Sequence, residues 1–173
     1  MKKLFTMAVV MVGATYLSAS AAFNAPTTAQ LAQAAGNPAM LSQMLQGATA
    51  QEAAEAMRAV IVAALGLGLN ADAQAARITQ IVGAGFTAMT TAPSGGTAAV
   101  TPDAFAQSLG TALGSSPVLS QNGVVVATIL SAVGAAGGGG TTGAALETSF
   151  TTALQTSVAA NVPAKGYEIQ QSK

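Results

Sequence analysis

The sequence predicts an all-α protein, a small helical bundle of six or seven short to medium helices that follows a cleaved signal peptide. Apolar residues recur at three- and four-residue spacing along most of the chain after Ala22, the period of one helix face. Capping residues and Gly or Pro stand at the ends of the same segments. Because cysteine is absent, packing rather than disulfides is expected to stabilise this bundle.

Residues 1–22 have the pattern of a secretion signal. A basic pair, "KK", precedes the apolar run Leu4–Leu17, and small residues allow a cut after Ala21 or Ala22. The alternative is an uncleaved membrane anchor, but the run is short for a span and ends in small rather than basic residues. We expect an exported protein, periplasmic or extracellular.

For the rest of the chain we expect one domain followed by a tail. Residues 23–164 are expected to form a single helical domain, which is long enough to bury a core of its own. Thr/Gly-rich breaks are expected near 90–101 and 137–142, and residues 165–173 form a polar C-terminal tail.

Two short helices are signalled at both of their ends. In "NPAMLSQMLQG", Asn37 is expected to cap the helix, Pro38 fits its first turn and Gly47 stops it. In "TPDAFAQSLGTALG", Thr101 is the expected cap and Gly114 the stop.

Two longer amphipathic helices are expected between these short ones. A capping box of Thr49 and Glu52 opens the first, and Asn70 caps the second. Their expected buried faces are Met57, Val60, Ile61, Ala64 and Leu65 in the first, and Ile78, Ile81, Val82, Phe86 and Met89 in the second.

The segment "NGVVVATILSAVGAAG", residues 122–137, allows two interpretations. Asn-Gly followed by three valines is typical of a strand that leaves a turn. The spacing of Val126, Ile129, Leu130 and Val133 favours a helix instead. A last helix is expected from Gly143 to Asn161.

A weak internal repeat links these helices. Ile78, Val82, Gly83 and Ala84 recur as Ile129, Val133, Gly134 and Ala135, and Phe105, Leu109 and Leu113 recur as Phe150, Leu154 and Val158. A true duplication predicts two stacked helical hairpins. The alternative is that Ala-rich amphipathic helices resemble one another by composition.

The composition argues against an enzyme. The chain has no His, Cys or Trp, so the commonest general base, the thiol nucleophile and the commonest metal ligands are missing. Glu52 and Glu55 lie close on one helix, but Arg58 makes a charge-compensated surface the simpler interpretation. We expect no catalytic residue, no cofactor and no metal site.

The charge argues against nucleic acid as a partner. Without the N-terminal segment 1–22 the chain keeps six acidic and four basic side chains, a net charge near minus two. Binding to phosphates needs a clustered basic surface.

The glycines of "VGAAGGGGTTGAALETSF" allow three interpretations. Gly138, Gly140 and Gly143 spell the G-x-G-x-x-G of dinucleotide loops, but that loop needs a preceding strand, and a helix is expected here. Four-residue spacing, as in Gly110 with Gly114, also suits helices that meet in a bilayer. The apolar helix that ends at Ala136 is short for a span, so we favour close packing and a hinge after Ala136.

Two G-x-G pairs fall inside the longer predicted helices. Gly66 with Gly68 and Gly83 with Gly85 imply either close crossing of neighbouring helices or helices that end earlier. Close crossing is our prediction for both pairs.

The uncharged stretch from Ala104 to Leu146 carries the functional prediction. Because no side chain in it is charged, a protein surface, a second copy or lipid is expected to cover part of it. We expect a secreted, non-enzymatic structural or protein-interaction module that self-associates or binds a protein through apolar helix faces. The alternative is a membrane-active protein that inserts Gly-spaced helices into lipid.

Overall fold

The computed structural model describes residues 23–91 and 99–161; the predicted signal peptide and the tail 165–173 lie outside these ranges. Over the described residues the chain is all-α, as predicted, without a strand. The α-helices are α1 (Thr28–Gly36), α2 (Leu41–Met44), α3 (Ala50–Leu65), α4 (Ala71–Thr90), α5 (Pro102–Gly114), α6 (Pro117–Ser120), α7 (Gly123–Ala136) and α8 (Gly140–Asn161), and a 3₁₀ turn, η1 (Pro38–Met40), precedes α2.

The described residues contain eight α-helices rather than six or seven, because α2 and α6 are single turns. The helix expected after Asn37 divides into η1 and α2. Asn37 does not cap this helix, because its side chain makes no capping hydrogen bond. The backbone N–H of Asn37 instead donates to the Gln33 carbonyl at 2.8 Å, which closes α1. Helix α6, which starts at Pro117, was not predicted.

Three predicted caps are confirmed, and they set where α3, α4 and α5 begin. The N–H of Glu52 donates to Thr49 Oγ1 at 3.3 Å, while the Thr49 N–H donates to the Glu52 carboxylate at 2.8 Å. Asn70 accepts from the first turn of α4 at 2.9 Å, and Thr101 accepts from the first turn of α5 at 3.3 Å. These side chains satisfy backbone donors that the helices leave unpaired.

Residues 123–136 form a helix, so the strand interpretation of the three valines is wrong. Asn122 caps α7 by accepting from the Val125 N–H at 3.2 Å. Ile129 and Val133 are buried as expected, whereas Val126 and Leu130 are only partly buried and Val124 is exposed. An Asn cap therefore outweighs the β-propensity of the valines.

The two interior G-x-G pairs behave differently. At Gly66 and Gly68 close crossing is wrong, because α3 ends at Leu65 and Gly68 has φ +67°. At Gly85 the Met57 side chain of α3 occupies the place of a Cβ, so the missing side chain makes room for a methionine and not for a close approach of the two helix backbones. Gly83 has no atom within 4 Å of a Cβ position.

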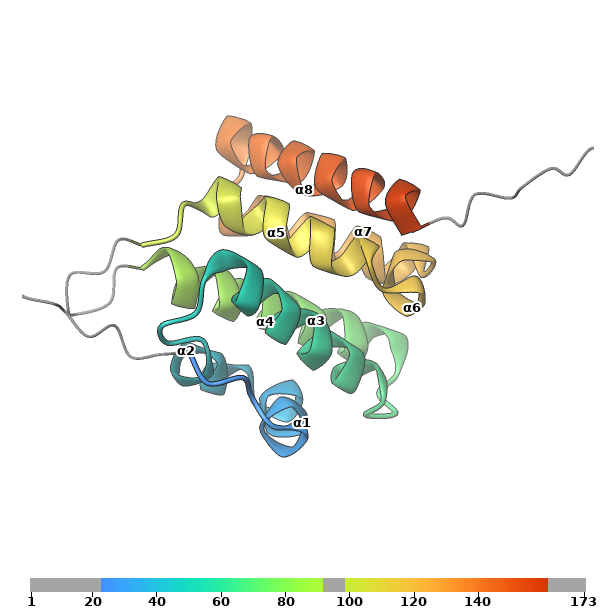
Figure 1. Ribbon diagram of the computed structural model, residues 1–173. Coiled ribbons are helices and arrows are strands. Elements are labelled where there is room, and N and C mark those ends of the chain that lie inside the picture. The colour runs from blue at the N-terminus through green and yellow to red at the C-terminus, as the bar shows by residue number, and fades with distance from the viewer. Residues whose placement is uncertain (1–22, 92–98, 162–173) are drawn as a thin grey trace, which may run out of the picture.

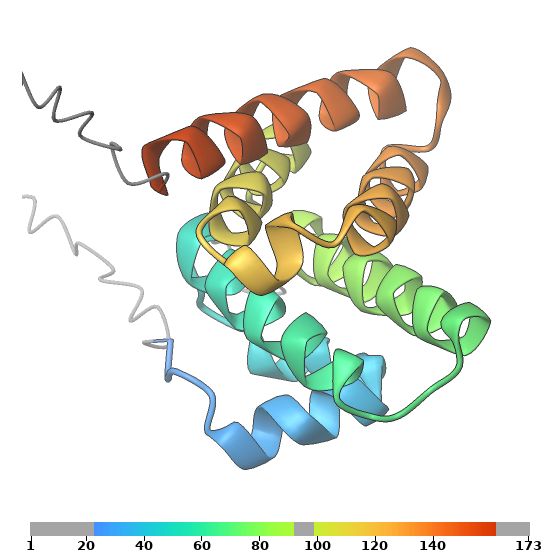
Figure 2. The ribbon, with the colours of Figure 1, turned by 90° about the vertical axis from the view of Figure 1, so that its right-hand side faces the viewer.

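The helices stack in two layers. Figures 1 and 2 show α8, α5 and α3 side by side in one layer, with α7 and α4 in the other. Helix α1 packs on α3, and α2 packs on α4. Neighbours within a layer run parallel: α5 and α8 both start at the left in Figure 1. The stack thus places α5 between α3 and α8.

The weak repeat corresponds to spatial neighbours. Helix α4 packs along α7 and α5 packs along α8, so the helices with similar sequences lie beside each other. Helices α4 and α5 touch each other much less than α3 touches α4. The expected hairpin of α4 with α5 is therefore loose, and α3–α4 and α7–α8 are the hairpins in close contact.

Much of the uncharged stretch 104–146 lies in the core. Phe105, Leu109 and Leu113 of α5 are fully buried, and Ile129 of α7 is fully buried in the same cluster. Phe105 meets Phe86 of α4 edge to face, with ring centroids 4.9 Å apart. The missing charges are thus explained in part by burial within the fold.

Helices α5 and α8 approach closely through glycine, which confirms the packing interpretation of this Gly pair. A Cβ at Gly110 would collide with the carbonyl oxygen of Phe150 and lie 3.1 Å from the Cβ of Ala153. A Cβ at Gly114 would lie 2.6 Å from the Cβ of Ser157. Between α7 and α8, a Cβ at Gly143 would lie 2.5 Å from the Gly134 carbonyl oxygen.

We predict that Gly110→Ala lowers the free energy of unfolding by about 1–3 kcal/mol, because the new methyl group meets backbone atoms of α8 that cannot move alone. Urea unfolding followed by circular dichroism measures this loss. Gly83→Ala is the matched control: it adds the same methyl group inside a helix with open space around it, and is expected to gain up to about 1 kcal/mol. Equal effects of the two substitutions would contradict the close contact.

Candidate functional site

The acidic residues of α3 have structural partners. Glu52 accepts hydrogen bonds from Thr49 at the start of the helix, and Glu55 forms an ion pair with Arg58 at 2.8 Å. Among residues 23–91 and 99–161 no group of three or more metal-binding side chains comes together. Arg58 thus compensates the charge of Glu55, as expected from the sequence, whereas Glu52 is engaged in the helix cap.

The glycine run 137–140 forms a turn between two helices, not the strand-to-helix loop that a dinucleotide needs. The N–H groups of Gly138 and Gly139 donate to the carbonyls of Ala135 (2.9 Å) and Gly134 (3.2 Å), the Schellman pattern that closes a helix. Gly138, Gly139 and Gly140 have φ of +79°, +70° and +59°. The turn is shorter than the break expected at 137–142, because α8 already begins at Gly140.

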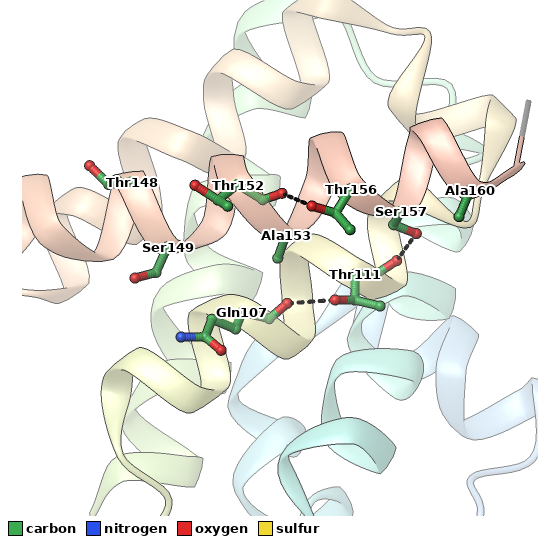
Figure 3. Close-up of a pocket in the computed structure, with 9 residues that line it drawn as sticks. All are labelled: Gln107, Thr111, Thr148, Ser149, Thr152, Ala153, Thr156, Ser157 and Ala160. Carbon is green, nitrogen blue, oxygen red and sulfur yellow. Dashed lines mark hydrogen bonds between the residues drawn. The ribbon is translucent and has the colours of Figure 1, made fainter.

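A groove of about 600 Å³ lies between α5 and α8, and the sequence analysis did not predict it. Figure 3 shows its lining, which is small and rich in hydroxyl groups. The lining residues are Gln107, Thr111, Thr148, Ser149, Thr152, Ala153, Thr156, Ser157 and Ala160. The four-residue spacing of threonines along α8 was the only signal for this groove.

The hydroxyl groups of this groove largely serve the helices themselves. Thr111 donates to the Gln107 carbonyl at 3.0 Å, and Thr156 donates to the Thr152 carbonyl at 2.8 Å. Ser157 donates to the Thr111 carbonyl at 2.9 Å and so joins α8 to α5. None of the described lining residues is charged. Ser149 donates to the Asp103 carboxylate, but no histidine in the sequence is present to activate any of these hydroxyl groups as a nucleophile.

A second groove, of about 400 Å³, lies between α4 and α7 and has the same character. Thr87 and Thr90 line it and donate to the carbonyls of Gly83 (2.9 Å) and Phe86 (2.7 Å). Alanines of α7 form the opposite wall. Both grooves are therefore products of packing thin helices side by side.

The most exposed large apolar side chains are near the ends of helices. They are Val62 (40% exposed), Leu67 (43%), Val118 (64%) and Val124 (73%), which we call the apolar end. They belong to the last turn of α3, the α3–α4 connection, α6 and the first turn of α7, and Figures 1 and 2 show these elements at the same end of the stack. Val118 and Val124, the two most exposed of the four, lie on the contacting elements α6 and α7 and form the centre of the candidate interaction surface.

Comparison of the chain with protein-family models, curated proteins and solved structures finds no match. Over the part of the chain that the structure describes, none of the helices combines the length and apolar character needed to cross a membrane.

We predict that Glu52 makes the stability of the protein depend on pH. Hydrogen bonds from the Thr49 N–H and then from its hydroxyl lower the pKa of Glu52. The interaction therefore stabilises the fold above the ordinary pKa of glutamate and is lost as the pH falls through the lowered value. Glu52→Gln keeps a capping side chain that does not titrate, so its urea midpoint should change less than that of the unsubstituted protein between about pH 6 and pH 3.

Thr49→Ala tests the same cap at neutral pH, where it should lower the free energy of unfolding by about 0.5–2 kcal/mol. Parallel pH curves for Glu52→Gln and the unsubstituted protein would contradict the role of this carboxylate.

Proposed function

We propose that this protein is an exported, non-enzymatic structural module that self-associates by docking its apolar end on the same surface of a second copy. The observation that carries the proposal is the exposure of Val118 and Val124, two large apolar side chains on neighbouring elements. Burying each of them would contribute about 1.5 kcal/mol, which favours association.

The charge distribution supports a second copy as the occupant. A contact about a twofold axis brings each residue near its own counterpart or a close neighbour, so every charge in it tends to meet a like charge. Val118 and Val124 lie in the uncharged stretch 104–146, which avoids this repulsion. The charged side chains of the described residues lie on α3, α4, α5 and α8, whereas α6 and α7 carry none.

The size of the surface predicts weak association. Stable interfaces bury roughly 800 Å² on each partner and centre on several apolar side chains. The apolar end offers four side chains, two of them only about 40% exposed. Self-association at micromolar to higher concentrations is what such a surface supports.

A non-enzymatic role is supported by the chemistry of the chain. The chain carries no histidine or cysteine, and two carboxylates of α3 are engaged in a cap and an ion pair. The grooves present hydroxyl groups that are bonded to backbone carbonyls. Export is supported by the basic and apolar pattern of the N-terminal segment 1–22.

We predict that Val118→Ser with Val124→Ser weakens self-association about tenfold or more, because both substitutions remove apolar area from the docking surface. Sedimentation velocity over a range of micromolar concentrations measures the effect, and binding of an apolar dye should fall in parallel. Ala144→Ser with Ala145→Ser, at exposed positions near the start of α8 and at the other end of the stack (Figure 1), is the control and should change neither. A monomer at every concentration, with no dye binding, would overturn the proposal.

We predict that the purified protein stays at the bottom of a flotation gradient with liposomes at neutral pH. The most apolar helix, α7, has 14 residues, which at about 1.5 Å each cover roughly 20 Å of a roughly 30 Å hydrocarbon core. Protein that rises with the vesicles would favour the membrane-active alternative. In that case Gly134→Leu with Gly138→Leu should abolish flotation.

A further inference from the structure

We propose that the glycine turn after α7 keeps helix α8 on its own chain, and that replacing these glycines lets α8 be exchanged between two copies of the chain. In the exchanged dimer, α8 of each copy packs on α5 and α7 of the other. The proposal concerns a different surface from the apolar end and stands independently of it.

The contacts of α8 are of a kind that exchange preserves. Phe150 is fully buried, Leu146 and Leu154 are nearly so, and the Ser157 hydroxyl donates to the Thr111 carbonyl at 2.9 Å. Each of these contacts joins α8 to another helix, so a second copy of α8 can make all of them. Exchange therefore changes only the turn itself and the number of chains in the assembly.

The last three glycines of the turn have open space around them. Cβ atoms placed on Gly138, Gly139 or Gly140 would meet no atom within 4 Å, whereas a Cβ on Gly137 would lie 2.9 Å from Leu146 Cδ1 and 3.0 Å from Gly143 Cα. The helix before the turn is closed by two backbone hydrogen bonds. Opening the turn breaks these two bonds and separates Gly137 from α8 of its own chain, a contact that α8 of a second copy can restore.

The three glycines set the balance between the closed and the exchanged forms. Their positive φ values suit glycine and disfavour any residue with a Cβ, so they stabilise the closed turn. In an opened chain, α7 and α8 would approach one continuous helix, in which glycine is a poor residue. Alanine reverses both preferences: it strains the closed turn and stabilises the continuous helix.

The composition of α8 also suits exchange. Five residues of this 22-residue helix are buried, and two of them are Gly143 and Ser157. Only Glu147 is charged along its whole length. Neither chain therefore has to desolvate a cluster of charges when the helices trade places.

The test replaces Gly138, Gly139 and Gly140 together by alanine. Each substitution should shift the equilibrium towards exchange about tenfold or more, so the triple variant should be mainly dimeric at micromolar concentration. The control is the triple replacement of Gly36, Gly83 and Gly123 by alanine, since these glycines also have open space and have no positive φ. The control should stay at the association state of the unsubstituted protein.

A cross-link then identifies which chain supplies α8. The side chains of Ser149 and Asp103 are hydrogen-bonded between α8 and α5, and the chain has no cysteine of its own. In Asp103→Cys with Ser149→Cys, a short bifunctional thiol reagent joins positions within one chain when α8 is closed. It joins two chains when α8 is exchanged, which gives a covalent dimer on a denaturing gel.

Covalent dimers in the turn variant, absent from the control, are the expected result. Dimers whose cross-links all lie within single chains would overturn exchange but not the apolar-end contact. Such dimers should dissociate when Val118→Ser and Val124→Ser are added. If the triple variant loses its helical circular dichroism signal, the single variant Gly139→Ala is tested in its place. A folded Gly139→Ala protein whose cross-links stay within one chain at every concentration would also overturn exchange.

Discussion

The close approach of α5 and α8 is the contact on which the rest of the structure depends. Helix α5 lies between α3 and α8, so its position determines whether the layer closes. Gly110 and Gly114 bring the backbone of α5 against the backbone of α8. The short separation of these two helices allows Phe105 and Phe150 to be buried completely. Aromatic residues make up only 4% of the chain, so few large side chains are available to fill a wider gap.

Thin helices also explain the unusual surface. A bundle that packs through Gly and Ala leaves its outward positions to Ser and Thr, and many of these threonines bond to a carbonyl one turn back, as Thr128 and Thr148 do. This bond satisfies the hydroxyl group within the helix. The resulting surface is polar without being charged, which suits association with an identical surface better than attraction of an ionic ligand.

The sequence predicts the local parts of this fold well and its assembly poorly. Caps such as Thr49 and Asn70 act within one turn, so their signals lie within a few residues of sequence, and the structure confirms them. The failures have non-local or competing causes: Asn37 closes the helix before it instead of capping the next one. The order of the layers, the grooves and the apolar end depend on which helices become neighbours, and no short pattern encodes that. The helical spacing of residues 124–136 does not indicate that Val124 is exposed, although its exposure makes it part of the candidate interaction surface.

The glycines show why spacing alone is a weak guide to function in such a chain. Gly110 permits contact between helices, Gly138 forms a turn with positive φ, and Gly68 lies beyond the end of α3. The same residue type thus serves two physical purposes, because Gly68 has a positive φ as Gly138 does. Only the environment separates them, because a missing Cβ matters where a neighbouring backbone occupies its place and a positive φ matters where the chain reverses. A motif such as G-x-G-x-x-G therefore indicates a ligand only when a strand and a helix flank it, and here helices stand on both sides.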